Sequence, residues 1–441
     1  MRKTRRTGLT TKSDGRLPVA IVGGGFSGTM VAANLARKGI KSVLIDGSGR
    51  AGQGIAYSTR EPAHVLNVRA EVMSAWPEDL DHFVRVAEAE GGDRRDFSQR
   101  RQFGRYLREI LSDAVNSGCV RVAEQQAVEA APASEGWTVR LADGEQLDAG
   151  GLVLAIGNQP PEPMPFGQES PRVINDPWGA EALAAVDHLS STNEDVLLVG
   201  TGLTMVDTIL SLDAAGHRGR IVGLSRRGLI PRGHTNDTVP APVDEDQVPF
   251  GHVRTLWRWL RRRGAEVGWR AAVDSLRPFS QQIWQSFPPA ERRRFARHAR
   301  PWWSVHRHRI APEVAQRLQE MIAEGRLEIV AARIQSVTDE GDSLAVTYRK
   351  RGTSIVMEGR FAYLINCTGP LGAIARTRDA LLRKMLEEGL ARPDQIGIAL
   401  EVDEQSRIAG ADRAWAVGPL TKGRYWEIIA VPDIRGQAAA I

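Results

Sequence analysis

Two glycine-rich turns constrain this chain more than any other feature, because each follows a short apolar run and precedes a helix-like pattern. The first turn is VAIVGGGFSG, Val19 to Gly28, and the second is VLLVGTGLTM, Val196 to Met205. Each apolar run predicts a buried parallel strand. Segments further on also match, since the endings LVLAIGNQP and YLINCTGPL are analogous. This internal repeat predicts two related nucleotide-binding units.

The first turn carries a complete GxGxxG pattern and an acid in the expected place. The three glycines permit a tight turn, a close approach of pyrophosphate and close packing of helix on strand. Phosphates would then lie at the helix N-terminus, where free N–H groups favour anions. Asp46 ends the next strand and is placed to accept from ribose hydroxyls. The candidate residues are Gly23, Gly25, Phe26, Ser27, Gly28 and Asp46.

The second turn differs from the first at two positions. Met205 stands where a third glycine is usual, and Ser225-Arg226-Arg227 stands where an acid would meet a ribose. An arginine pair can bind a 2′-phosphate, which favours NADPH over NADH. The alternative for the arginines is a solvated surface pair. The candidate residues are Gly200, Gly202, Leu203, Thr204, Ser225, Arg226, Arg227 and Gly369.

Charge is distributed unevenly along the 441 residues, whose net charge is +5. Residues 1–16 hold six basic residues and one acid, and we expect them to form a disordered tail. Residues 252–310 hold fourteen arginines and three acids, interleaved with six tryptophans. We expect this segment to be mostly helical. An amphipathic lid with Trp inward and Arg outward is the leading interpretation, and single-stranded nucleic acid binding is the least favoured.

A sharper interpretation is that this basic segment lines the site of an anionic substrate. Its densest part is HRHR, His306 to Arg309. Arginine there could clamp a carboxylate or a purine anion. The candidate residues are His298, Arg300, His306, Arg307, His308 and Arg309.

The rest of the composition excludes several classes of protein. Cys119 and Cys367 are the only cysteines and form no CxxC pair, which argues against a disulfide framework and a thiol–disulfide reductase. No apolar run approaches the roughly 20 residues of a membrane span, and no signal peptide is recognised. We therefore expect a cytoplasmic protein with neither a membrane nor a nucleic-acid partner, and no metal site is predicted.

Several motifs outside the turns resemble one bacterial family. They are GQGIAYS (Gly52 to Ser58), HVLNV (His64 to Val68), VGTGLTMVD (Val199 to Asp207), SRRGLIPR (Ser225 to Arg232), HRHRIAP (His306 to Pro312) and WEIIAVPDIRGQ (Trp426 to Gln437). The chain resembles the FAD/NAD(P)-binding family that includes flavin-dependent urate hydroxylases and aspartate N-oxidising, nitrosuccinate-forming monooxygenases. It is more distantly similar to ornithine and lysine N-hydroxylases.

The resemblance implies FAD at the first turn and NADPH at the second. It also implies flavin contacts from three further segments, with the start of the last helix facing the flavin and stabilising its reduced form. Many other flavoproteins have an Asp after the glycine of the late Gly418 turn, where this chain has Pro419. The candidate flavin residues are Gly54, Ala56, Tyr57, Asn67, Val68, Gly157, Gly418, Pro432 and Ile434.

These observations predict an α/β protein with two Rossmann-like, three-layer ββα domains, the second inserted in the first. We expect FAD binding by 17–165 and 371–441, NADPH binding by 190–235 and 321–370, and a helical insertion at 236–320. The expected later strands are Val120 to Val122, Trp137 to Leu141, Leu152 to Ile156, Leu327 to Val330, Leu344 to Arg349, Ile355 to Met357 and Ala362 to Asn366.

The function predicted is that of an FAD-dependent, NADPH-consuming, single-component monooxygenase. It would use O₂ to hydroxylate or N-oxidise a small polar, anionic substrate through a flavin C4a-hydroperoxide. The substrate would be an amino acid such as aspartate or a purine such as urate. The alternatives are an NADPH-dependent flavoprotein reductase or dehydrogenase, and a dinucleotide-binding sensor without turnover. A homo-oligomer is left open.

Overall fold

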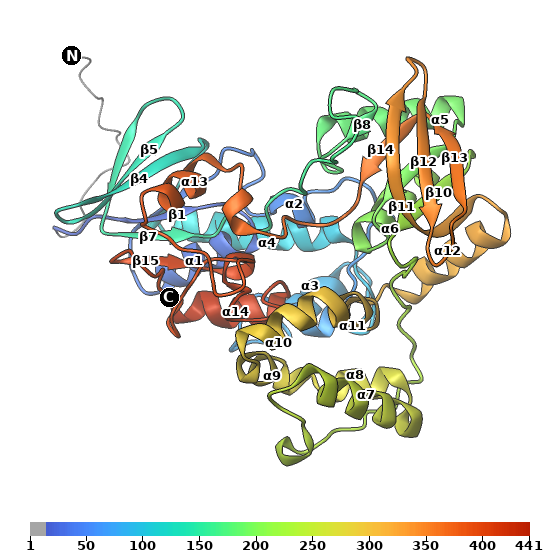
Figure 1. Cartoon of the computed structure of the whole chain (residues 1–441). Coiled ribbons are helices and arrows are strands. Elements are labelled where there is room, and N and C mark those ends of the chain that lie inside the picture. The colour runs from blue at the N-terminus through green and yellow to red at the C-terminus, as the bar shows by residue number, and fades with distance from the viewer. Residues whose placement is uncertain (1–14) are drawn as a thin grey trace.

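The computed structural model describes residues 15–441, so the expectation of a disordered tail falls almost entirely outside the described residues. Two sheets occupy opposite sides of the molecule, and a group of helices lies below and between them (Figure 1). Each sheet contains one glycine turn at the carboxyl end of a central parallel strand. This arrangement confirms the predicted α/β class with two dinucleotide-type sheets.

The first sheet has the order β15-β7-β1-β2-β3 and is parallel throughout. Its strands are β1 Val19–Val22, β2 Ser42–Ile45, β3 Val120–Ala123, β7 Gly151–Leu154 and β15 Ala414–Ala416. Successive side chains point to opposite faces, so Ile21 joins one core and its neighbours Ala20 and Val22 join another. Both faces of the sheet are therefore buried.

Different layers cover those two faces. The helical layer consists of α1 Phe26–Arg37, α3 His82–Ala89, α4 Arg100–Asn116 and α14 Val431–Ala440. The opposite layer consists of the antiparallel strands β4 Ala127–Ala133, β5 Gly136–Leu141 and β6 Gln146–Ala149, with α13 Ala380–Glu387 beside them. Short α2 Gly54–Tyr57 lies near α4. The first unit is thus a ββα sandwich.

The second sheet has seven strands in the order β13-β12-β11-β10-β9-β14-β8. They are β8 Val173–Ile174, β9 Val196–Val199, β10 Ile221–Ser225, β11 Leu327–Asp339, β12 Leu344–Lys350, β13 Val356–Phe361 and β14 Tyr363–Asn366. Helices α5 Ala180–Thr192, α6 Leu203–Ala214 and α12 Pro312–Ala323 pack on one face. The strand expected to end at Val330 continues to Asp339, so its meander (residues 327–361) extends the main sheet.

The helical insertion contains α7 Val253–Val267, α8 Trp269–Ser275, α9 Ser280–Ser286, α10 Pro289–Arg294 and α11 Arg300–Arg307. Its own core includes Trp284, Phe287, Phe295 and Trp303. The arginines of α7 at positions 254, 258, 261 and 262 are exposed. Much of the segment is therefore amphipathic, as the leading interpretation expected, but Trp302 is exposed and Arg309 is buried.

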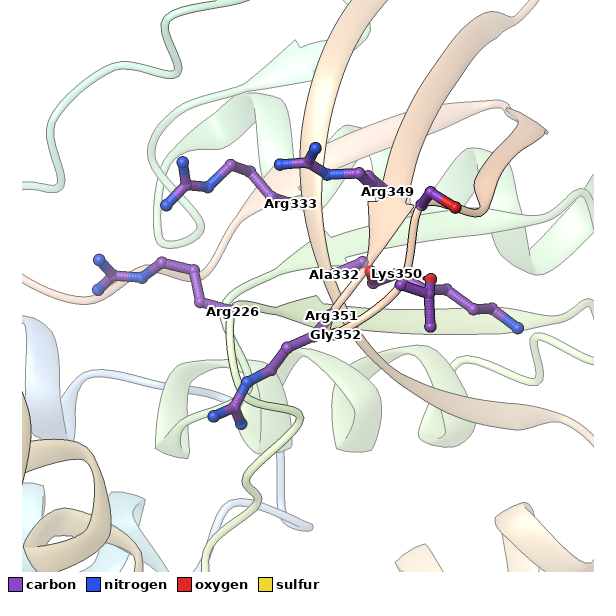
Figure 2. Close-up of a pocket in the computed structure, with 9 residues that line it drawn as sticks. Arg226, Ala332, Arg333, Arg349, Lys350, Arg351 and Gly352 are labelled. Carbon is purple, nitrogen blue, oxygen red and sulfur yellow. Dashed lines mark hydrogen bonds between the residues drawn. The ribbon is translucent and has the colours of Figure 1, made fainter.

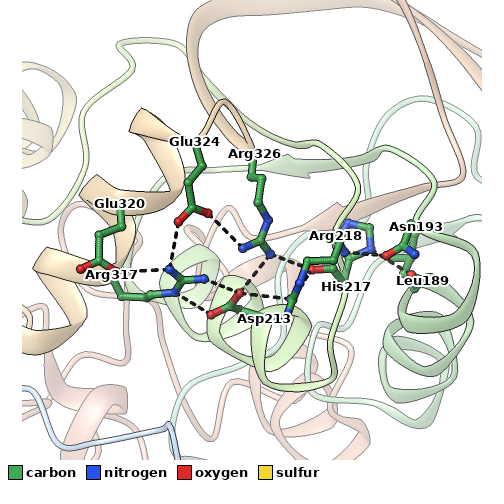
Figure 3. Close-up of polar contacts among 9 residues, drawn as sticks. All are labelled: Leu189, Asn193, Asp213, His217, Arg218, Arg317, Glu320, Glu324 and Arg326. Atoms are coloured by element: carbon green, nitrogen blue, oxygen red, sulfur yellow. Dashed lines mark hydrogen bonds and ion pairs between the residues drawn. The ribbon is translucent and has the colours of Figure 1, made fainter.

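A partly buried carboxylate joins the end of this insertion to the second sheet (Figure 3). Asp213, at the end of α6, accepts hydrogen bonds from Arg317 Nε at 2.8 Å and Nη2 at 2.9 Å, and from Arg326 Nη2 at 3.0 Å. The Arg317 hydrogen bonds lower the pKa of Asp213 to about 2. This network fixes α12 against α6.

A second polar contact joins the two sheet units. Arg100 on α4 donates two hydrogen bonds to Asp207 on α6, at 2.8 and 2.9 Å. Buried His64 lies 2.9 Å from the Asp207 carbonyl oxygen and 3.0 Å from Ser211 Oγ through Nε2. His64 of the HVLNV motif is therefore a contact between the units. Within residues 15–441, no helix is long and apolar enough to span a bilayer.

Candidate cofactor and substrate sites

The first glycine turn has no room for side chains. A Cβ at Gly23 would lie 2.5 Å from the Ala155 carbonyl oxygen, and one at Gly28 would collide with the Gly23 carbonyl. Gly25 is the N-cap of α1 and provides no side-chain cap, so the first amides of the helix at Phe26 and Ser27 keep their N–H groups available. The backbone of Gly54 closes against Gly25. This cradle has the form and the donors that a diphosphate requires.

Asp46 lies beside this cradle at the end of β2. Its Oδ2 accepts the Gly24 N–H at 2.7 Å, and its Oδ1 accepts the Ser48 N–H at 2.7 Å. Oδ1 also accepts the Ser48 hydroxyl at 2.5 Å, so the second lone-pair site of Oδ2 is the one left for a ribose hydroxyl. The predicted acid therefore lies where the dinucleotide pattern requires it.

The second turn repeats the first with different residues. A Cβ at Gly200 would collide with the Cys367 carbonyl, whereas one at Gly202, the N-cap of α6, would meet open space. The helix begins at Leu203 and Thr204 without a side-chain cap. Gly369 has φ +87° and open space around it. This turn therefore also presents free helix amides to a phosphate.

Ser225 occupies the place that Asp46 takes in the first unit. Its Oγ accepts from Thr201 Oγ1 at 2.8 Å and from the Gly228 N–H at 3.0 Å. Arg226 follows and lines a cavity of about 540 Å³ together with basic residues of the β11–β13 meander (Figure 2). Burial lowers the pKa of Arg227, and the charges of Arg226 and Arg351 lower it further.

The predicted flavin segments converge on the first turn. A Cβ on Gly418 would lie 2.5 Å from Ser27 Oγ, and its N–H donates to Gln437 Oε1 of α14 at 2.7 Å. Ile434 of α14 is buried beside them. Burial raises the pKa of Tyr57 to about 12. Val68 packs partly buried on the same core, Ala56 is exposed on α2, and Gly157 has φ +68° just after β7.

His234 is a residue of this region that the sequence analysis missed. Its Nε2 donates to the Asn67 carbonyl oxygen at 3.0 Å, and its ring lies 5.1 Å from that of Phe97. Burial lowers the pKa of His234 to about 4, so the ring is neutral near pH 7. This hydrogen bond fixes the Asn67 backbone to the loop around His234 that leads into the insertion. A single histidine in a loop carries no pattern that would have revealed it.

A second cavity, of about 470 Å³, lies where the insertion meets the start of α14. Arg277, Gln281 and Arg307 line it from the insertion, and Trp426 and Pro432 line it from the C-terminal segment. Three carboxylates, Asp274, Glu427 and Asp433, complete its charged lining. The cavity therefore opens beside Pro432, the residue predicted to face the flavin, and carries both signs of charge.

The six basic residues proposed for an anionic substrate do not converge on one site. Arg307 alone of them lines the second cavity, with Nε 3.0 Å from Glu427. Arg309 is buried and donates two hydrogen bonds to Asp274, at 2.8 and 2.9 Å. His306 makes its side-chain bond to the Trp302 carbonyl, and His308 lies 3.8 Å from Glu427. Much of this charge is thus used inside the insertion.

His298 and Arg300 lie apart from that cavity. Both residues are exposed, although the protein around Arg300 partly desolvates its guanidinium group. Burial lowers the pKa of Arg300, and the charge of Arg226 lowers it further. Burial also lowers the pKa of Lys422 to about 8, and the charge of Arg300 adds to that shift. Arg300 therefore lies near enough to both Arg226 and Lys422 for their charges to interact.

Glu427 is the centre on which the insertion docks. It is buried, adopts φ +66°, and accepts hydrogen bonds from Trp303 Nε1 and Arg307 Nε. Trp284 stacks on Trp426 beside it at 4.5 Å. The sequence offered one signal for this role, because Glu427 follows Trp426 and precedes an apolar run within the motif WEIIAVPDIRGQ.

Arg277 and Asp433 are the charged groups of the second cavity that remain available. Among the side chains of residues 15–441, neither has a hydrogen-bond or ion-pair partner. Burial lowers the pKa of Arg277 and raises that of Asp433, and each charge partly opposes the shift of the other. No group of three or more possible metal ligands occurs in the described part of the chain.

Comparisons agree with this geometry. Residues 20–159 match the model of a family described as FAD-NAD(P)-binding. L-lysine 6-monooxygenase from Pseudomonas syringae superposes with a TM-score of 0.66 at 15% identity, covering 96% of this chain and 97% of that one. Ornithine hydroxylase from Pseudomonas aeruginosa gives 0.65 at 16%, with the same coverage. Thioredoxin reductase from Lactococcus lactis gives 0.54 at 14%, covering 96% and 95%.

At these identities, the likeness establishes a shared fold: two dinucleotide-type units of the kind found in flavin monooxygenases and in thioredoxin reductase. No curated protein matches the chain by sequence.

Proposed function

We propose that this protein is an FAD-dependent, NADPH-consuming, single-component monooxygenase of a small polar substrate. The observation that carries the proposal is the second cavity, which lies between the amphipathic insertion and the start of α14. In this arrangement the flavin edge, the substrate and a cover that excludes water meet at one place. The two monooxygenases of the same fold act on lysine and ornithine, as their names state.

The residues present fit both cofactors. Gly23, Gly25 and Asp46 would hold the adenosine diphosphate half of FAD, and the uncapped start of α14 would face its ring. Gly202 and Arg226 would hold NADPH. Bound FAD would supply electron transfer and reaction with O₂, while the protein supplies position, charge and exclusion of water.

The charges of the cavity support a substrate with both an anionic and a cationic group. The pairs Arg307–Glu427 and Arg309–Asp274 neutralise themselves. Arg277 and Asp433 are left to bind a carboxylate and an ammonium, respectively. An amino acid such as aspartate meets this requirement, whereas urate offers no cation to Asp433. We therefore place the substrate among small amino acids.

A flavoprotein reductase without oxygen insertion is the second candidate, supported by the fold shared with thioredoxin reductase. A disulfide version of it would need a reactive thiol pair. Cys119 and Cys367 are free thiols, and burial raises the pKa of Cys367 to about 12. This argues against thiol chemistry but leaves other electron acceptors. A non-catalytic sensor would keep the same cofactor cradles without turnover.

One assay separates these functions. The purified protein should be yellow and should oxidise NADPH faster when an amino acid substrate is present. Under oxygen-18 gas, the product should carry the label. Substrate-stimulated turnover without labelled product would favour the reductase, and a protein that takes up no FAD would reject both enzymes.

A further inference from the structure

The cavity beside Arg226 is lined by several basic side chains, and no nearby acid of residues 15–441 neutralises their positive charge. Arg226 comes from the end of β10, Arg333 from β11, Arg349 from β12, and Arg351 from the turn that follows. No acid lines the cavity. Figure 2 shows the guanidinium groups of Arg226, Arg333 and Arg351 directed to the same side of the meander, while Lys350 is directed to the other.

The register of the meander makes this charge unfavourable in the empty protein. Arg333 and Arg349 are directly paired across the antiparallel β11 and β12. Like charges opposite each other destabilise such a pair. Among the described residues, none of the four arginines has a side-chain partner, whereas Arg220 of the same sheet pairs with Asp195 and Glu328. An anion bound among them would remove the repulsion.

Backbone contacts bring the meander to the end of β10. Ser225 pairs with Ala331 in the parallel register, so Arg333 follows two residues later. The Arg351 N–H donates to the Ala331 carbonyl oxygen at 2.8 Å. A Cβ on Gly228 would meet Ala331 at 3.1 Å. The loop after Arg227, the middle of β11 and the turn at 351–354 are therefore one surface.

We propose that Arg333, Arg349 and Arg351 bind the 2′-phosphate end of NADPH together with Arg226, and that the meander thereby sets the preference for NADPH over NADH. This rests on the proposed function, because it takes the second turn as the nicotinamide-nucleotide site. The end of β10 is where the adenosine ribose of a dinucleotide lies in such folds. A dianionic phosphate there matches a cluster of planar, charged donors.

The test is equilibrium binding of two probes to the holoprotein by calorimetry: 2′,5′-ADP, which carries the 2′-phosphate, and 5′-AMP, which differs from it only in lacking that phosphate. Arg351→Gln and Arg333→Gln should each weaken binding of 2′,5′-ADP by about tenfold to a hundredfold, since hydrogen bonds to charged groups contribute about 1.5–3 kcal/mol. Binding of 5′-AMP should change less than about twofold. Arg226→Ala should behave like them.

Arg360→Gln is the matched control, because Arg360 lies on β13 of the same meander and already pairs with Glu340. It should change neither affinity. Arg226, Arg333, Arg349 and Arg351 are exposed, so their variants should melt no lower than the wild type, and Arg333→Gln should melt slightly higher because it relieves the repulsion with Arg349. Equal losses for both probes, or no loss at Arg333 and Arg351, would overturn the proposal. If the wild type bound 2′,5′-ADP no better than 5′-AMP, the NADPH assignment itself would fail.

Discussion

At the scale of single residues, the two glycine turns place a small residue against a large one at the same helix–strand contact, but in opposite order. The hydrogen bonds Gly23 N to Ile45 O and Gly200 N to Leu224 O set the same register, so Leu44 and Gly223 are equivalent. In the first turn, glycine on the helix faces leucine on the strand. In the second, buried Met205 on the helix faces glycine on the strand, where a Cβ would lie 2.7 Å from the Met205 sulfur. Met205 is therefore no defect in the second turn.

This exchange predicts strong coupling between Met205 and Gly223. Gly223→Leu alone should destabilise the protein by about 1–3 kcal/mol through overpacking, and Met205→Ala by about 2–5 kcal/mol through the cavity it leaves. The double variant should be at least about 1 kcal/mol more stable than the sum of the two losses predicts. Denaturant unfolding of the four proteins measures this, and simple additivity would contradict it.

The unpaired charges of the second cavity predict a change in substrate affinity. Arg277→Gln and Asp433→Asn should each raise the KM for the amino acid substrate by about tenfold or more, because each removes one charge-assisted hydrogen bond. The KM for NADPH should not change. Steady-state kinetics check this, with Arg254→Gln as the control on exposed α7. A substrate indifferent to Asp433→Asn would show that no cation is bound there.

At the scale of elements, the sequence predicted those strands that a strong apolar pattern marks. The strand Val196–Val199 and the strand starting at Leu327 begin as predicted, because the first is buried at every position and the second starts with the buried apolar residues Leu327 and Val330. β4 was missed because its sequence AVEAAPA is rich in alanine and contains Pro132, which give a weak strand signal, and β11 was cut short because exposed polar residues interrupt it. Their strand character comes from pairing with neighbours that are distant in sequence. Helix α4 was missed because its buried residues are spread among charged ones.

The network at Asp213 predicts a pH-dependent link between α6 and α12. Because the folded pKa of Asp213, about 2, lies below the unfolded value of 3.8, its contribution is complete above about pH 4 and is lost as the pH falls through about 2. The difference corresponds to about 2 kcal/mol. Asp213→Asn should therefore cost about 2 kcal/mol at pH 7 and progressively less below pH 4.

Urea unfolding of both proteins from pH 7 to pH 2.5 measures that difference. Glu324→Gln is the control. Glu324 belongs to the same network through its ion pairs with Arg317 and Arg326, but its side chain is 45% exposed. It should cost less than about 1 kcal/mol at any pH. A gap between wild type and Asp213→Asn that stays constant with pH would refute the linkage.

At the scale of the whole molecule, the sequence identified the regions of the site but not the use of their charges. The HRHR motif was recognised, yet Arg309 and Arg307 are neutralised by Asp274 and Glu427, which lie 35 and 120 residues away in the chain. Such pairing depends on how the insertion docks, which no local pattern records. Arg277 and Asp433 were missed for the same reason.

The docking of the insertion on Glu427 predicts how tightly NADPH oxidation is coupled to product formation. Glu427→Gln would remove the carboxylate that pairs with Arg307 in the buried contact, which disfavours the closed position. Water would then reach the flavin side of the cavity, so NADPH should be spent on peroxide instead of product. The ratio of product to NADPH should fall several-fold while FAD remains bound, and limited proteolysis should cut the insertion faster. Glu245→Gln, an exposed acid that only meets Gln282, should change neither readout. Normal coupling in a protein whose insertion is cut rapidly would mean that the insertion does not keep water from the reaction.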